Sequence, residues 1–238
     1  MSINPLPSSG SCQLWRVDLD APPEPVDVAC LSETEWERAR RFVFRRDRER
    51  FIAAHAALRR ILAIRTGTSA ALLDFKQGDF GKPSLAGYAG IHFNLSHSQA
   101  AALIAVNEGA EIGVDIELLR PMPDAERLAA TCFTPCEIRA LQGLPDDARE
   151  RAFLVGWTRK EACLKALGLG LSANLQALEV GLDSVESEIE YVDAEGINRL
   201  RVTPIDVGSG AVGALAFETG RLRASPASPK PAAFEIVQ

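Results

Sequence analysis

The order of the predicted elements indicates an α+β fold. Helical patterns followed by antiparallel-looking strands occur twice along the 238 residues, whereas a βαβ protein would alternate strands and helices throughout. The composition, 47% hydrophobic and 24% charged, is that of an ordinary globular protein. A chain of this length can bury a substantial core, and we expect either one large domain or two small fused ones.

The first 120 residues are predicted to contain an early strand, an arginine-rich helical region and several later strands. Ser32 and Glu35 have the spacing of a capping box, which starts a helix. The helical pattern resumes over residues 47–66, where Gly67 can act as the C-terminal cap. In the segment IHFNLSHS apolar and polar side chains alternate, as in a half-buried strand. The strands expected here are residues 13–19, 91–98, 101–109 and 112–119.

The remainder of the chain is predicted to follow a similar order. Thr134 and Glu137 form a second capping box, with Pro135 at the first helical position, and Asp147 with Glu150 has the same spacing. The helix that begins there is expected to end near residue 167 and to be followed by strands at 178–182, 188–193, 198–206 and 211–218. Residues 224–238, rich in Pro, Ala and Ser, are expected to form a mobile tail.

Charge and composition argue against several classes of protein. The formal net charge of −6 argues against general nucleic-acid binding. The N-terminus does not resemble a secretory signal, and no apolar run approaches the roughly 18–20 residues that span a bilayer, so no membrane partner is expected. The five cysteines include no C-x-x-C pair and the chain has only three histidines, which argues against a structural zinc site. We therefore expect a cytoplasmic protein with reduced thiols.

Two carboxylates lie two residues apart in the segment GVDIE. On a strand, Asp115 and Glu117 point to the same face, where their like charges need water or a cation between them. This pattern alone favours an exposed acidic face on an edge strand. The alternative is a Mg²⁺ site, because this ion binds a few carboxylate oxygens and leaves room for a phosphate substrate.

The segment GWTRKEACLKALGLG places three chemically different side chains on one helical face. Trp157, Glu161 and Lys165 follow one another at i, i+4 spacing. Taken alone, Glu161 and Lys165 favour a surface ion pair worth ~0.2–0.5 kcal/mol. The alternative is that Glu161 supplies a third carboxylate for a metal ion, and that Lys165 meets the phosphate that the ion attracts.

Further candidates for anion binding lie upstream. Ten of the 26 basic residues are arginines between positions 38 and 65. Guanidinium groups suit terminal phosphates, although much of this region is expected to be a solvated helix face. Lys82 lies on a turn in the segment GKP, and Ser96 and His97 lie near the end of the strand FNLSHS. His97 can donate a hydrogen bond to a phosphate. Ser96 and His97 are not expected to form a hydrolase site, because adjacent residues lack the geometry of a nucleophile and its base. His55 is expected to be buried and structural.

These motifs together resemble the signature of the 4′-phosphopantetheinyl transferases. The segment GVDIE followed by FLVGWTRKEACLKALGLGL is similar to the paired motif of that family, and RRFVFRRDRERF, GKP and FNLSHS resemble its larger, Sfp-type (surfactin-type) class. The resemblance spans about residues 32–175. It implies a pseudo-dimer of two similar α+β halves related by a pseudo-twofold axis, with the ligand cleft between them. The expected halves are residues 1–110 and 111–223.

The resemblance also implies roles for individual residues. The match assigns Asp115, Glu117 and Glu161 to Mg²⁺. It assigns Lys165 to the pyrophosphate of coenzyme A. The other implied coenzyme A contacts are Arg50 at the 3′-phosphate, Gly81, Lys82 and Pro83 beside the adenine, and Ser96 and His97 at the phosphates. One position departs from the family, since a basic residue sometimes found near position 35 is here Glu35.

The reaction implied by the resemblance is the Mg²⁺-dependent transfer of 4′-phosphopantetheine from coenzyme A to a serine of an apo acyl or peptidyl carrier protein, with release of adenosine 3′,5′-bisphosphate. Glu161 and Lys165 are the expected catalytic residues, and the general base is either Glu161 or a metal-bound water. We expect a monomer that activates carrier proteins, often for secondary-metabolite biosynthesis. Two other classes stay open: a coenzyme A-binding regulatory or scaffolding protein, and a Mg²⁺-dependent hydrolase of nucleotide diphosphates.

Overall fold

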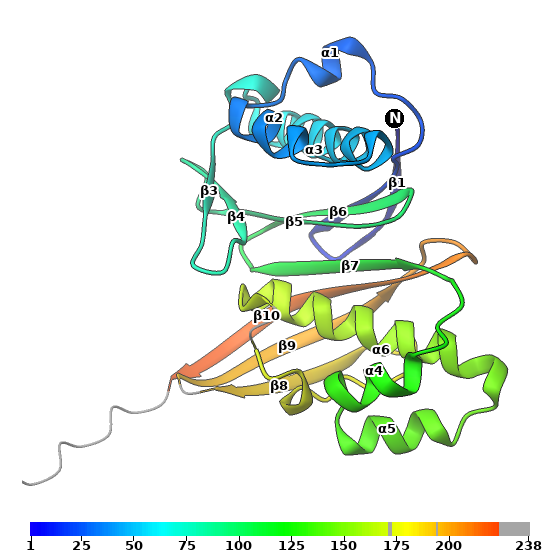
Figure 1. Cartoon of the computed structure of the whole chain (residues 1–238). Coiled ribbons are helices and arrows are strands. Elements are labelled where there is room, and N and C mark those ends of the chain that lie inside the picture. Colours follow the sequence, from blue (N-terminus) through cyan, green and yellow to red (C-terminus); the bar gives the residue numbers. More distant parts are fainter. Residues whose placement is uncertain (171–172, 194, 224–238) are drawn as a thin grey trace, which may run out of the picture.

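Two four-stranded antiparallel sheets, each covered by a long helix, make up the structure (Figure 1). The computed structural model describes residues 1–170, 173–193 and 195–223, so the tail predicted for residues 224–238 lies outside the described residues. The first sheet has the strand order β1-β2-β6-β5 and the second the order β7-β10-β9-β8. The predicted α+β class with two halves is therefore confirmed.

The first half places its helices on one face of the first sheet (Figure 1). Its strands are β1 (Ser2–Ser9), β2 (Cys12–Asp18), β5 (Ile91–Ser98) and β6 (Ala101–Glu108), with β3 (Phe75–Gln77) and β4 (Pro83–Leu85) forming a small separate sheet. Its helices are α1 (Pro25–Val28), α2 (Glu33–Arg40), α3 (Arg45–Thr66) and the 3-10 turn η1 (Ala70–Leu72). The capping box of Ser32 and Glu35 is confirmed, and Gly67, with φ of 68°, closes α3. Strand β1 was not predicted, because it is a largely exposed edge strand without apolar alternation.

The second half begins with β7 (Ile112–Leu118) and ends with three further strands of the same sheet. Between them lie α4 (Ala125–Cys132), α5 (Pro135–Gln142), α6 (Asp146–Leu167) and the 3-10 turn η3 (Leu175–Ala177), followed by β8 (Ser187–Asp193), β9 (Gly196–Ile205) and β10 (Ala211–Arg223). The capping box of Thr134 and Glu137 is confirmed. The one expected at Asp147 is wrong: α6 starts at Asp146, and the Glu150 carboxylate accepts a hydrogen bond from the Met122 backbone instead.

The strand predicted at residues 178–182 is also wrong. This segment is irregular, because its backbone carbonyls accept from buried side chains of α6 and not from a neighbouring strand. Arg159 donates to the carbonyl of Val180, and Lys160 donates to the carbonyl of Leu178. The short apolar run at residues 178–182 is therefore a buried loop, since an apolar pattern alone does not distinguish a buried strand from a buried loop.

The two halves share part of their hydrophobic core. One core lies between α3 and the first sheet, and a second lies between α6 and the second sheet. A third joins strands β2 and β6 of the first sheet to β7 and β10 of the second, through residues that include Leu14, Leu103, Val114, Ile116 and Leu215. Because β6 and β7 belong to different sheets and the chain passes between them at residues 109–111, we propose the boundary between the halves there.

Helix α6 lies directly against β7 at Gly113. A Cβ atom on this residue would come within 2.1 Å of the Ala162 carbonyl oxygen and 2.3 Å of the Ala166 backbone nitrogen. Only glycine allows such a close approach, which brings the side chains of α6 onto the acidic face of β7. Across the described ranges, no helix combines the length and the apolar character needed to cross a membrane.

Candidate active site at the junction of the two sheets

The acidic segment of β7 faces the junction between the halves and not open solvent. Asp115 is only 5% exposed, and the neighbouring Val114 and Ile116 point into the shared core. The exposed acidic face that the pattern alone favoured is therefore wrong for Asp115. Glu117 lies nearer the surface, where Arg120 donates to its carboxylate at 2.6 Å.

Edge strands β5 and β7 are joined by side chains. The predicted alternation of β5 is confirmed: Phe93 and Leu95 pack in the first core, and the polar side chains of alternate residues turn to β7. A row of polar contacts between the halves results. Its bonds run from the Val114 amide to Asn94 Oδ1 at 3.0 Å, from Ser96 Oγ to Asp115 at 2.6 Å and from Ser98 Oγ to Glu117 at 2.7 Å.

Lys165 completes this row from helix α6. Its ammonium group lies 2.6 Å from Asp115 Oδ1 and 3.1 Å from Ser96 Oγ. Among the described residues, no ion pair joins it to Glu161, so the surface pair at i, i+4 spacing is wrong. The buried carboxylate of Asp115 is the stronger partner, because attraction between opposite charges grows as water is excluded.

Two carboxylate oxygens at this junction, Asp115 Oδ2 and Glu161 Oε1, are buried and have no hydrogen-bond partner among the described residues. Burial raises the pKa of both carboxyls, and Lys165 opposes this rise. The charges of Asp115 and Glu117 raise the pKa of Glu161 further. A buried acceptor without a donor costs free energy, so this site favours a positively charged group between the carboxylates.

These residues fit a hard divalent cation. Within residues 1–170, 173–193 and 195–223, no three His, Cys, Asp or Glu side chains already lie close enough to hold a metal by themselves. Mg²⁺ does not need such a cage, because it is usually bound by one or two carboxylates together with substrate phosphates. The two unpartnered oxygens of Asp115 and Glu161 offer that donor set, and Glu117 lies on the same face of β7.

A cavity of about 400 Å³ opens on the other side of β5, beneath helices α2 and α3. Because side chains alternate along a strand, Ser96 points to β7 whereas His97 lines this cavity. Burial lowers the pKa of His97, and the nearby Lys165 charge lowers it further. His97 thus lies in the cavity wall, on the face of β5 opposite Ser96. Gly81 and Pro83, both predicted beside a ligand, also line the cavity.

Several aromatic and charged side chains line the cavity that were not predicted from the sequence to do so. Arg38, not singled out among the arginines, lies in the wall with its guanidinium 5.5 Å from the Phe51 ring. Its place on the cavity side of α2 depends on tertiary packing, which the charge pattern does not encode. The aromatic rings in the wall are those of Phe42, Phe51 and Phe75.

Glu35, the position that departs from the family pattern, is a buried anchor in the cavity wall. Its carboxylate lies 2.9 Å from His55 Nδ1 and 2.7 Å from Arg59 Nε, and it accepts from the Ser32 backbone at 2.8 Å. Burial alone would raise the pKa of Glu35, but hydrogen bonds from His55 and Ser32 and the charge of Arg59 together lower it to about 2. The expected structural role of His55 is consistent with this contact.

Two predicted ligand contacts are engaged elsewhere in the protein. Arg50 donates two hydrogen bonds to Asp20, at 2.6 and 2.9 Å. Lys82 does not line the cavity, and its ammonium group is bound by the second half. The roles predicted for both stay predictions, and each would require a ligand to share or replace these partners.

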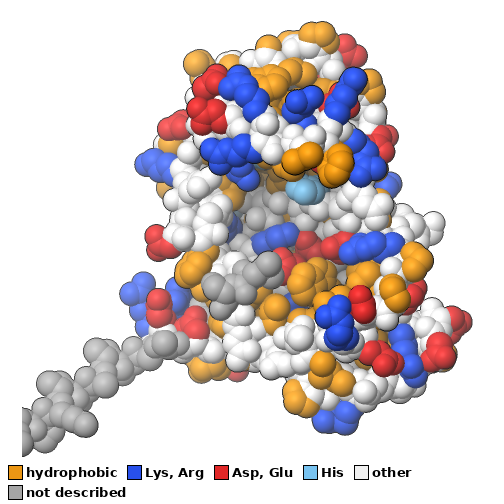
Figure 2. All heavy atoms as spheres, in the orientation of Figure 1, with side chains coloured by type: hydrophobic (Ala, Val, Ile, Leu, Met, Phe, Trp, Pro, Cys, Tyr) orange, Lys and Arg blue, Asp and Glu red, His pale blue; other side chains and the backbone are white. Residues whose placement is uncertain are grey.

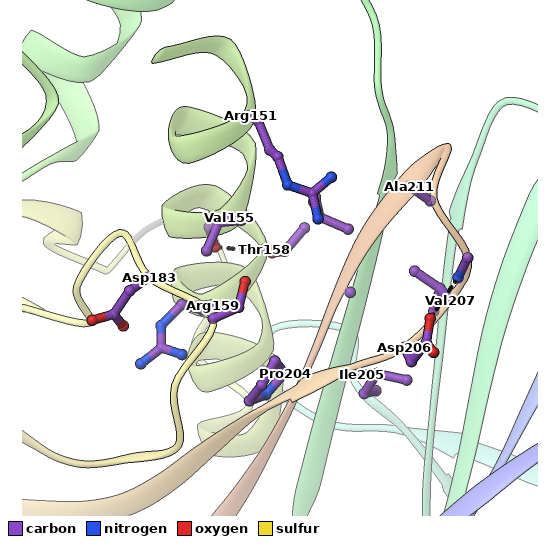
Figure 3. Close-up of a pocket in the computed structure, with 14 residues that line it drawn as sticks. Arg151, Val155, Thr158, Arg159, Asp183, Pro204, Ile205, Asp206, Val207 and Ala211 are labelled. Atoms are coloured by element: carbon purple, nitrogen blue, oxygen red, sulfur yellow. Dashed lines mark hydrogen bonds between the residues drawn. The ribbon is translucent and has the colours of Figure 1, made fainter. Parts of the chain in front are cut away.

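The surface around the junction is hollowed, with acidic and basic side chains along the middle of the hollow and hydrophobic ones above and below it (Figure 2). A second cavity, of about 340 Å³, lies apart between α6 and the turn before β10 (Figure 3). Arg151 and Arg159 reach it from α6 and Asp206 from the turn. It contains neither unpartnered carboxylate oxygen, and Arg159 is already bonded to backbone carbonyls.

Comparisons with known proteins match both halves to one family. Residues 111–206 match the model of the 4′-phosphopantetheinyl transferase superfamily, and residues 25–109 match that of an N-terminal 4′-phosphopantetheinyl transferase domain. The 4′-phosphopantetheinyl transferase HetI of Nostoc sp. is 39% identical over 214 residues, which cover 88% of this chain and 90% of HetI. A 4′-phosphopantetheinyl transferase of Bacillus subtilis is 32% identical over 70% of this chain and 73% of its own length. Sfp of Bacillus subtilis strain 168 is 26% identical over 76% of this chain and 80% of Sfp.

The fold and the comparisons agree on the class of protein, an enzyme that transfers a phosphopantetheinyl group. The chain belongs to the 4′-phosphopantetheinyl transferase superfamily. The resemblance that the motifs GVDIE and WTRKEACLKALG indicated is confirmed. The alternative of a scaffolding protein loses its support, because the relatives that cover most of the chain are named as enzymes.

Proposed function

We propose that this enzyme transfers 4′-phosphopantetheine from coenzyme A to a serine hydroxyl of an apo acyl or peptidyl carrier protein, with Mg²⁺ and with release of adenosine 3′,5′-bisphosphate. In this reaction a bond forms between the serine oxygen and the phosphorus that bears pantetheine. The bond from that phosphorus to the bridging oxygen of the pyrophosphate breaks, and the serine proton must be accepted by a base. The observation that carries the proposal is the pair of unpartnered, buried oxygens on Asp115 and Glu161, next to Lys165.

Asp115, Glu117 and Glu161 are the residues that would hold Mg²⁺. The ion, when bound, supplies positive charge that offsets the charge developing on the leaving phosphate. Asp115 and Glu161 come from β7 and α6, which are held together at Gly113. Their carboxylates are therefore placed in advance, so that little free energy is spent on ordering them.

Lys165 is the residue best placed to meet the pyrophosphate. It is partly exposed and held by Asp115 and Ser96, and an ammonium group stabilises the extra negative charge of a leaving phosphate. Ser96 orients Lys165, since its hydroxyl lies at hydrogen-bond distance from both Lys165 and Asp115.

Glu161 is our proposed general base. Its pKa is raised by burial, and a carboxylate with a raised pKa accepts a proton more readily than an ordinary one. This supports proton transfer from the carrier serine to Glu161.

We assign the nucleotide end of coenzyme A to the cavity beneath α2 and α3. Its aromatic rings suit stacking on a base, and Arg38 and His97 in its wall suit a phosphate. Glu35 is neutralised there by Arg59, so its carboxylate does not repel an anion as a free one would. That the enzyme works as a cytoplasmic monomer stays a prediction.

The test is to incubate the enzyme with coenzyme A, Mg²⁺ and several apo carrier proteins, and to measure the mass of each carrier. We expect a gain of one phosphopantetheine group at the carrier serine, lost when that serine is replaced by alanine. No gain on any carrier contradicts the proposal. Release of adenosine 3′,5′-bisphosphate without any carrier present would instead favour the hydrolase alternative.

A further inference from the structure

Lys82 connects the two halves of the enzyme through a single ammonium group. The residue lies in the turn between β3 and β4 of the first half, and its side chain is 17% exposed. A lysine ammonium has three N–H donors, and three acceptors surround this one. They are Glu111 Oε2 at 2.5 Å, the carbonyl of Ile112 at 3.0 Å and the carbonyl of Ala166 at 2.8 Å.

Two of the three acceptors, the carbonyls of Ile112 and Ala166, belong to the two elements that carry the catalytic side chains, and Glu111 directly precedes β7. Ile112 begins β7, the strand of Asp115, and Ala166 follows Lys165 in the last turn of α6. The last carbonyls of a helix lack partners within the helix and attract positive charge. Lys82 therefore binds the end of α6 at a point where the helix itself offers no donor.

The aliphatic stem of Lys82 contacts the same helix end. Gly168, with φ of 68°, ends α6. A Cβ atom placed on Gly168 would lie 3.5 Å from Lys82 Cδ, which is van der Waals contact. Glu111 is held from a second side by His92 Nδ1 of β5, at 3.0 Å. The contact is thus part of a packed junction and not an isolated surface pair.

Lys82 points away from the cavity that its neighbours line. Gly81 and Pro83 both border the cavity, whereas Lys82 does not. All three donors of the ammonium group are already used by the second half. A contact with a nucleotide would require Lys82 to abandon a buried arrangement, which costs free energy.

We infer that Lys82 is a positioning residue, which fixes the end of α6 and the start of β7 against the first half and acts on phosphopantetheine transfer through Lys165 and Asp115. The inference rests on the proposed function for its effect on catalysis. It differs from the adenine contact that the resemblance implies for this lysine, because it places the ammonium group at the junction and not at the ligand.

The experiment compares four variants by steady-state transfer kinetics with coenzyme A as the varied substrate. Lys82→Met keeps the length of the side chain and removes its charge. Glu111→Gln weakens one partner, and the double variant combines the two changes. Lys76→Met is the matched control, since Lys76 is an exposed lysine on β3 of the same small sheet.

We expect Lys82→Met to lower kcat by about 10- to 100-fold, because small displacements of catalytic groups have effects of that size. The KM for coenzyme A should change by less than about 3-fold. Glu111→Gln should lower kcat in the same direction by a smaller factor, and the double variant should be no slower than Lys82→Met, as for residues that act as one unit. Lys76→Met should match the unaltered enzyme.

A rise of about 10-fold or more in the KM for coenzyme A with kcat unchanged in Lys82→Met would overturn the inference, since that pattern marks a ligand contact. Kinetics equal to those of the unaltered enzyme would overturn it too. If Lys82→Met does not fold, Glu111→Gln decides: a lowered kcat with little change in KM supports the inference, and an unchanged kcat overturns it.

Hydrogen exchange tests the contact without any transfer activity, which separates this inference from the proposed function. The amides of Gly168 and Leu169 bond to the carbonyls of Lys165 and Leu164 at the end of α6. In Lys82→Met their exchange should be faster by about 10-fold, while the amides of α3 and those of Lys76→Met keep the original rate. Unchanged exchange at the end of α6 would show that Lys82 does not hold it.

Discussion

At Asp115, groups from both halves meet on one carboxylate. Ser96 of β5 and Lys165 of α6 share its Oδ1 atom, and Oδ2 has no partner within the part of the chain that the structure describes. A buried carboxylate with one satisfied oxygen and one free oxygen is costly for stability. Such an arrangement is typical of a residue kept for binding a charged ligand and not for folding.

Asp115→Asn tests this role, because it keeps the shape of the side chain and removes its charge. We expect transfer to fall by about 100-fold or more, as when a fixed electrostatic contact to a transition state is lost, while the protein still folds. The measurement is kcat with saturating Mg²⁺, together with thermal unfolding. Glu190→Gln, at an exposed carboxylate on β8 of the same sheet, is the control. Near-normal turnover in Asp115→Asn would remove this residue from the site.

Glu35 has the opposite character, since all of its partners are inside the protein. It bonds to His55, Arg59 and the backbone of Ser32. The sequence predicted its capping box but not the other contacts. His55 and Arg59 lie on α3, twenty or more residues away, and only tertiary packing brings them to Glu35.

The lowered pKa of Glu35 predicts a loss of stability in acid. Its folded value of about 2 lies below the ordinary value of 4.5, so its stabilising effect is complete above about pH 4.5 and is lost as the pH falls toward 2. The shift corresponds to roughly 3 kcal/mol. Urea unfolding of the wild type and of Glu35→Gln should show a difference in unfolding free energy that is largest near pH 5.5 and falls by more than half at pH 3. A difference independent of pH would contradict the assigned pKa.

Among the secondary-structure elements, the contact between α6 and β7 decides where the catalytic side chains lie. At Gly113 the backbone of β7 meets the backbone of α6, and the three nearest atoms to an added Cβ all belong to the helix backbone. A helix backbone cannot rotate away as a side chain can. Any side chain at this position would therefore displace α6, with Glu161 and Lys165 on it.

Gly113→Ala should lower both stability and activity. Overpacking usually costs about 1–3 kcal/mol and occasionally more, and we expect the upper end here because three backbone atoms are involved. Thermal unfolding and kcat are the measurements. The control is Gly220→Ala on β10 of the same sheet, where an added Cβ meets nothing within 4 Å, and which should stay within about 0.5 kcal/mol. Equal stability of the two variants would show that α6 adapts to the extra methyl group.

Elements with strong local signals were predictable from the sequence, and those defined by tertiary context were not. The helices that begin at Glu33 and Pro135 have complete capping boxes, which depend on residues three apart. The sequence also singled out the carboxylates Asp115 and Glu117, and it singled out Glu161 with Lys165, because each pair has a local spacing. The exposed strand β1, the covered loop at 178–182 and the partner of Lys165 depend on what the rest of the chain places beside them.

At the scale of the whole molecule, the shared core makes the halves one structural unit. Residues of β2 and β6 pack against residues of β7 and β10 without an intervening layer. The site is likewise shared, because Ser96 and His97 come from the first half and Asp115 and Lys165 from the second. Neither half alone offers both the cavity and the carboxylates.

Unfolding in urea should therefore be a single transition. The tryptophans report on both halves, since Trp15 and Trp36 lie in the first and Trp157 lies on α6 of the second. We expect a Trp157→Phe variant and a variant with both Trp15→Phe and Trp36→Phe to give coincident fluorescence midpoints, as cooperative unfolding requires. Midpoints that differ clearly would show that the halves unfold separately.

The passage of the chain from β6 to β7 also has a consequence for the synthesis of the protein. The first half leaves the ribosome with the apolar face of β2 and β6 uncovered, including Leu14 and Leu103. Its cover comes from β7, made next, and from β10, the last strand of the second sheet to be made. At about 5–20 residues per second, the interval before β10 emerges is on the order of ten seconds. During that time the nascent chain exposes an apolar surface, and the cell must prevent this surface from associating with other nascent chains.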